Sequence, residues 1–76
     1  MEVRIGVEHI PKEISIELTD DTDRDELRSR VEEALSGAVN VLWLVDLRGR
    51  QVGISSEKIC YVELGADQID RTVGFG

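Results

Sequence analysis

The chain has 76 residues, enough for one domain, and carries nine Lys and Arg residues against sixteen Asp and Glu, a net charge of −7. Binding to nucleic acid or to an anionic membrane is not expected, because both draw their affinity from clustered positive charge. Hydrophobic residues make up 41% of the chain, so we expect a folded domain rather than a disordered segment.

The first part of the chain predicts two strands. Apolar and polar residues alternate over residues 2–8 and again over residues 13–19. This period of two is typical of half-buried strands, and Pro11 breaks it because proline cannot donate to a ladder. We therefore predict an antiparallel hairpin whose inward side chains are Val3, Ile5, Val7, Ile14, Ile16 and Leu18.

A helical period follows. Apolar residues recur at spacings of three and four along one stripe: Leu27, Val31, Ala34, Leu35 and Ala38. Thr22 suits the N-cap position, and Asp25 three residues later completes an approximate capping box. Gly37 stands where a glycine would end the helix. One amphipathic helix is predicted here.

Residues 39–47 are almost continuously apolar, which indicates a strand covered on both faces or an edge buried by a partner. One helix can cover only one face of a two-layer domain. The other set of side chains would then face water, and it is either Val41, Trp43 and Val45 or Leu42 and Leu44. Two explanations stay open: the C-terminal tail packs over this set, or the set forms a partner or self-association surface.

A turn and two further strands complete the pattern. Asp46–Gly49 has Asp at the first position and Gly at the last, as in a type I turn. Residues 52–54 and 59–64 read as the returning strand and a final strand. Cys60 lies within the apolar alternation of the final strand, so we expect its thiol to be buried and unreactive.

The elements combine into an α+β fold of order ββαβββ, with one helix packed on a small mixed sheet in two layers. This order resembles the β-grasp architecture of ubiquitin-like proteins, an analogy of fold that says nothing about activity. Residues 1–65 are predicted to form the domain, and residues 66–76 a tail that is partly flexible or docked on it. A single cysteine, with no apolar leader and no long apolar run, predicts a cytoplasmic protein.

Three segments carry a family resemblance: Met1–Val7, Asp46–Arg50 leading to Ile59–Gly65, and Arg71–Gly76. Together they resemble a family of short actinobacterial proteins known as domain of unknown function 3107. The resemblance spans nearly the whole chain, and the closing Val-Gly-Phe-Gly is its most specific part. It implies an actinobacterial source and a cytosolic setting, and it offers no catalytic residues to carry over.

Candidate chemistry is sparse. The acidic residues 20–25 with Glu32 approximate a calcium loop, but Glu26 stands where that loop needs glycine, so helix capping explains them better. His9 and Cys60 are the only residues of their types, too few for a zinc site or a catalytic pair with geometric support. No glycine-rich phosphate loop is present. We therefore predict no enzyme activity, no metal and no cofactor.

The function predicted is a non-catalytic interaction or regulatory module that binds another protein through one sheet face, with a homodimer as one form. The residues expected to contact the partner are Trp43, Arg48, Arg50 and Tyr61. One alternative is a ubiquitin-like or sulfur-carrier protein acting through Gly76, although the bulky Phe75 would hinder threading into an activating enzyme. A second alternative is a small-molecule binding domain, for which no pocket residues can be named.

Overall fold

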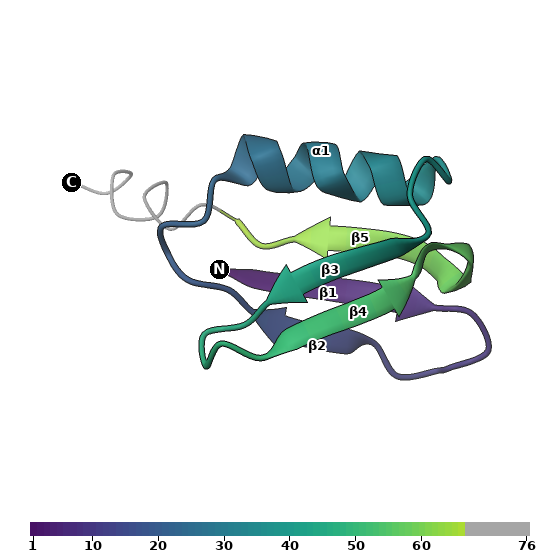
Figure 1. Ribbon diagram of the computed structural model, residues 1–76. Coiled ribbons are helices and arrows are strands. Elements are labelled where there is room, and N and C mark those ends of the chain that lie inside the picture. The colour runs from purple at the N-terminus through teal and green to yellow at the C-terminus, as the bar shows by residue number, and fades with distance from the viewer. Residues whose placement is uncertain (67–76) are drawn as a thin grey trace.

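The computed structural model describes residues 1–66 of the chain. Within them the order is β1 (Glu2–Val7), β2 (Ile14–Glu17), α1 (Arg24–Leu35), β3 (Val41–Val45), β4 (Gln51–Ser55) and β5 (Ile59–Leu64), with a short 3-10 helix (Ser56–Lys58) before β5 (Figure 1). The predicted α+β class and element order are confirmed. Of the tail predicted over residues 66–76, all but Ala66 lies outside the described residues.

The strands form two antiparallel sheets, which corrects the prediction of one mixed sheet. Sheet A has the strand order β2-β1-β5, and sheet B is the β3–β4 hairpin. In sheet A, Val3 of β1 lies opposite Ile16 of β2 on one side and Leu64 of β5 on the other. Element order alone does not determine which edges pair, because β5 reaches β1 from the far end of the chain. This pairing does not confirm the β-grasp topology.

The two sheets face each other across one buried core, and α1 packs against β3 and β5, one strand from each sheet (Figure 1). The alternation of the first hairpin and the helical stripe both point into this core, as predicted. Leu35, the last helical residue, and Ala38, beyond the end of the helix, are exposed, which corrects the prediction for these two members of the stripe. The buried apolar residues are Val3, Ile5, Ile16, Leu18, Leu27, Val31, Ala34, Leu42, Leu44 and Ile54.

The helix ends are set by two residues. Asp23, and not Thr22, is the N-cap: its Oδ1 accepts hydrogen bonds from the N–H groups of Asp25 at 3.0 Å and Glu26 at 3.1 Å. Both Asp and Thr are good N-cap residues, so the sequence pattern alone places the cap within one residue. At the other end Gly37 takes a φ of 83°, which confirms the predicted glycine stop.

Cys60 is exposed, which corrects the prediction of a buried thiol. Gly6 pairs with Tyr61 and Val7 pairs with Ile59, so Cys60 is the extra residue of a bulge in β5. The bulge shifts the alternation by one position, and a strict period of two therefore places this side chain wrongly.

Candidate functional site

The outer surface of sheet B is uncharged and centred on Trp43, with its large apolar side chains on β3. Leu42 and Leu44 are each 2% exposed, whereas Trp43 is 53% exposed on the opposite side of the same strand. Neither β3 nor β4 contains a charged residue. We call this surface the hairpin face, and its members are Val41, Trp43 and Val45 of β3 with Gln51, Gly53 and Ser55 of β4.

Trp43 is held in place from two directions. Its ring lies over Gly53, its cross-strand neighbour, where a Cβ atom would come within 2.7 Å of the Trp43 Cζ3 atom. Any larger residue at this position would displace the ring. From the other side, the Arg30 guanidinium on α1 donates a hydrogen bond to the carbonyl oxygen of Trp43. The indole is thus positioned by the hairpin register, and the backbone of Trp43 is joined to the helix, yet half of the side chain faces solvent.

Asp46 organises the turn between β3 and β4. The N–H of Gly49 donates to the carbonyl oxygen of Asp46 at 3.0 Å, and Gly49 has a φ of 82°, as expected for a type I turn closed by glycine. The carboxylate of Asp46 accepts the N–H groups of Arg48 at 2.8 Å and Arg50 at 2.9 Å, and the Nε–H of Arg50 at 2.7 Å. These bonds, above all that from the Arg50 side chain, lower the pKa of Asp46 from its ordinary value.

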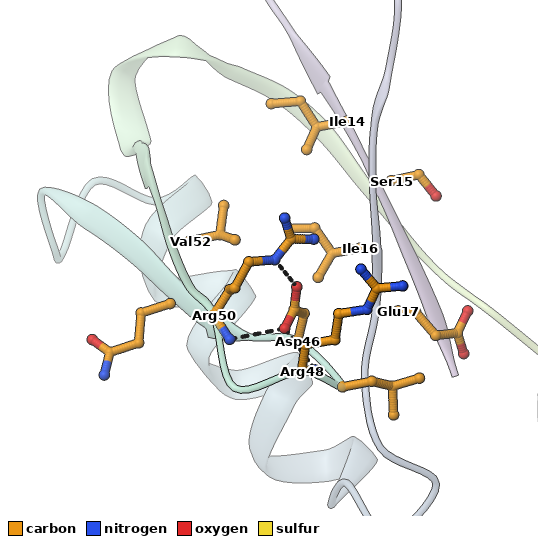
Figure 2. Close-up of a pocket in the computed structure, with 10 residues that line it drawn as sticks. Ile14, Ser15, Ile16, Glu17, Asp46, Arg48, Arg50 and Val52 are labelled. Atoms are coloured by element: carbon orange, nitrogen blue, oxygen red, sulfur yellow. Dashed lines mark hydrogen bonds and ion pairs between the residues drawn. The ribbon is translucent and has the colours of Figure 1, made fainter.

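A groove lies beside this turn, between β2 and β4 (Figure 2). Its volume is about 570 Å³. The side chains of Arg48 and Arg50 both extend from the turn toward β2, on either side of Asp46 (Figure 2). The lining includes Ile14, Ser15, Ile16 and the acidic Glu17 of β2 with Arg48, Arg50 and Val52 of the hairpin.

Tyr61, the fourth predicted partner residue, does not lie near Trp43, Arg48 or Arg50. It lies on the outer face of sheet A, over Gly6, so the core separates it from Trp43. Its hydroxyl donates to the carboxylate of Glu13, and this hydrogen bond raises the pKa of Tyr61 above its usual value. The structure therefore brings Arg48 and Arg50 together at the groove, sets Trp43 on the outer side of the same hairpin, and places Tyr61 elsewhere.

The groove was not predicted from the sequence. Its floor comes from Ile14 and Ile16 of one hairpin and Val52 of another, and each of these reads only as an inward strand residue. The one local feature of the sequence that indicates the groove is the pair of arginines beside the turn. Gly76, on which the carrier alternative depends, lies outside the described residues.

The site offers binding surfaces built from apolar side chains and two guanidinium groups. Among residues 1–66 there is no group of three or more His, Cys, Asp or Glu side chains that could hold a metal ion. In the same part of the chain, no helix is long and apolar enough to cross a membrane.

Fold and site together define a small α+β domain with an exposed apolar strand face and a groove bordered by two arginines. The chain matches the family model "Protein of unknown function (DUF3107)" over residues 1–76. It belongs to this family, and the resemblance carried by the three sequence segments is confirmed at that level. No curated protein matches the chain.

Proposed function

We propose that the chain is a non-catalytic protein-interaction module of the cytoplasm that binds another protein chain through the hairpin face. The supporting observation is the exposure of Trp43 between Val41 and Val45, on a strand whose other side chains belong to the core. Contiguous exposed apolar residues tend to mark interfaces, and tryptophan is enriched among the residues that dominate binding energy.

A second copy of the chain is the partner that this surface suits best. Two copies repel each other through their net charge of −7. The strands of the hairpin face contribute none of that charge, so two such faces can meet about a two-fold axis without opposing like charges. Self-association through this face would also remove Trp43 from water.

Sedimentation velocity over a concentration series tests this proposal. The wild-type chain is expected to associate reversibly, and Trp43→Ala should weaken association at least tenfold, since a central aromatic anchor contributes about 2 kcal/mol or more. Tyr61→Ala is the matched control, because it removes a comparably exposed aromatic from the other sheet. It should leave association unchanged, with circular dichroism checking the fold of both variants.

A wild-type chain that stays monomeric at every concentration contradicts self-association. The partner would then have to be a different protein, captured by the wild-type chain and not by Trp43→Ala. The carrier alternative and the β-grasp comparison stay predictions. Deleting Gly76 separates the carrier alternative from the interaction proposal, which expects association to be unchanged by the deletion.

A further inference from the structure

The groove between β2 and β4 is an opening between the two sheets. Helix α1 packs against β3 and β5 and so covers the opposite seam (Figure 1). Outside the ladders and the helix of residues 1–66, one backbone hydrogen bond joins the sheets: the N–H of Leu47 donates to the carbonyl oxygen of Glu17 at 3.0 Å. The groove is therefore closed at the turn and opens along β2 and β4.

The backbone of β2 presents peptide groups to this groove. Hydrogen-bonded pairs alternate along an antiparallel ladder. The N–H of Leu18 donates to Met1 at 2.8 Å and the amino group of Met1 donates to Leu18 at 3.1 Å, so Ile16 and Ile14 bond to β1 in the same way. Ser15 lies between them and directs its N–H and C=O away from β1. This edge can accept another strand.

The facing edge of β4 has the same property. The N–H of Ser56 donates to the carbonyl oxygen of Asn40 at 2.9 Å, which sets the alternation of the hairpin. Counted from this bond, the peptide groups of Gln51 and Gly53 point away from β3. Gln51 itself lines the groove, so unpaired backbone groups border it on both sides.

The side chains give the groove a polarity along its length. At the closed end lie two guanidinium groups and the carboxylate of Glu17, whose charge is paired with the amino group of Met1 at 2.8 Å. Arg50 uses its Nε–H for Asp46 and retains its two terminal amino groups, and Arg48 makes no ion pair with a carboxylate of residues 1–66. Both oxygens of Asp46 are already engaged within the turn. The floor beyond is apolar, formed by Ile14, Ile16 and Val52.

We propose that this groove binds the C-terminal segment of a partner protein as a strand added to β2, with its terminal carboxylate held by Arg48 and Arg50. Strand addition supplies backbone hydrogen bonds, and guanidinium groups bind carboxylates with paired, charge-assisted bonds. A chain end suits the groove because the bond between Leu47 and Glu17 blocks a strand from running on. This site shares Gln51 with the hairpin face, but it uses the backbone edge of β4 and not the outer surface of the sheet, so it does not depend on the function proposed for that face.

A library of random hexapeptides tests the proposal, each peptide made once with a free C-terminal carboxylate and once as the amide. Free acids should bind the full chain, and amidation should weaken the best binders at least tenfold. Arg48→Gln should weaken them to a similar degree. Arg28→Gln, which alters an exposed cation of α1, should leave binding unchanged. Equal binding of acids and amides, no bound peptide, or unchanged affinity in Arg48→Gln would overturn the proposal.

Amide hydrogen exchange at Ser15 and Gln51 shows whether the groove is filled by a peptide, by another part of this chain or by a second copy. The proposal expects fast exchange at both in the free monomer and slow exchange with peptide bound. Slow exchange in the free monomer would mean that this chain covers its own groove. Slow exchange at Ser15 only at high protein concentration would mean that a second copy does, since Ser15 lies outside the hairpin face. Either result overturns the proposal.

Ser15→Pro gives an independent check on strand addition. It removes the donor of the edge while leaving the bonds of β2 to β1, and proline is tolerated at such edge positions. The folded variant should bind no peptide. A folded Ser15→Pro variant that binds as tightly as wild type excludes strand addition to β2.

Discussion

The outer faces of the two sheets differ sharply, although both sheets share one core. On sheet A the outer side chains are polar and bonded to each other: Arg4 pairs with Glu2 at 3.3 Å, and the hydroxyl of Ser15 donates to Glu2 at 2.6 Å. On sheet B the corresponding face carries Trp43 and two valines. Since one small domain can cover a sheet with charge, the apolar face of the other is a local property and not a general result of small size.

The aromatic residue on each sheet sharpens this contrast. Tyr61 and Trp43 each lie over a cross-strand glycine, an arrangement that shields backbone and fills the missing side chain. Tyr61 has its hydroxyl bound by Glu13, whereas the indole of Trp43 makes no hydrogen bond to a described residue. The aromatic ring over a glycine therefore has a polar partner on sheet A and has none among the described residues on sheet B.

The largest difference in the free energy of unfolding is expected between substitutions on the core side and on the outer side of β3. Leu44→Ala should lower the free energy of unfolding by about 2–5 kcal/mol, because it leaves a cavity in the core. Val45→Ala, on the hairpin face of the same strand, should change it by less than about 0.5 kcal/mol in the monomer. Urea unfolding at low protein concentration measures both. Similar losses would mean that Val45 is buried in the free chain.

The turn that presents the hairpin face should depend on the charge of Asp46. Its pKa is lower in the folded chain than in the unfolded chain, so its contribution to stability is present above about pH 3.9 and is lost as pH falls through the folded value. Asp46→Ala should destabilise more than Asp46→Asn, which keeps an acceptor for the two backbone N–H groups. Both should flatten the acid limb of the stability profile, and an unchanged limb contradicts this assignment.

Smaller losses of stability are expected when the glycine beneath each aromatic ring is replaced by alanine. Gly6→Ala and Gly53→Ala should each destabilise by about 1–3 kcal/mol, since a Cβ would come within 2.1 Å of Tyr61 and 2.7 Å of Trp43. In a Trp43→Ala background, Gly53→Ala should become neutral or stabilising, because the obstructing ring is gone. A double-mutant cycle measures this coupling. Additive effects would show that the ring does not rest on Gly53.

Local features of the fold could be predicted from the sequence, and contacts between distant segments could not. The helix stop at Gly37 and the turn at Gly49 follow from glycine at positions that need a positive φ. The alternation of β1 and β2 identifies the inward residues because polar side chains mark the other face. In β3 both faces are apolar, so only the structure separates Leu44 from Trp43.

The candidate site shows the same limit. Arg48 and Arg50 share a turn, and their proximity could be predicted. Tyr61 was expected near them and lies on the other sheet, because strand pairing decides its position and no local pattern encodes that pairing. The bulge at Cys60 likewise depends on the register between β1 and β5. The groove lies between the edges of β2 and β4, which do not pair with each other. The absence of pairing leaves no pattern of apolar and polar residues in either strand, so the sequence does not predict the groove.

The most direct test of the central claim is the emission of Trp43, the only tryptophan of the chain, recorded as the purified protein is diluted. The hairpin face as a self-association surface predicts blue-shifted emission at high concentration and a red shift on dilution, with the same midpoint as dissociation in the ultracentrifuge. Emission that does not change while the protein dissociates would place the interface elsewhere and contradict the account.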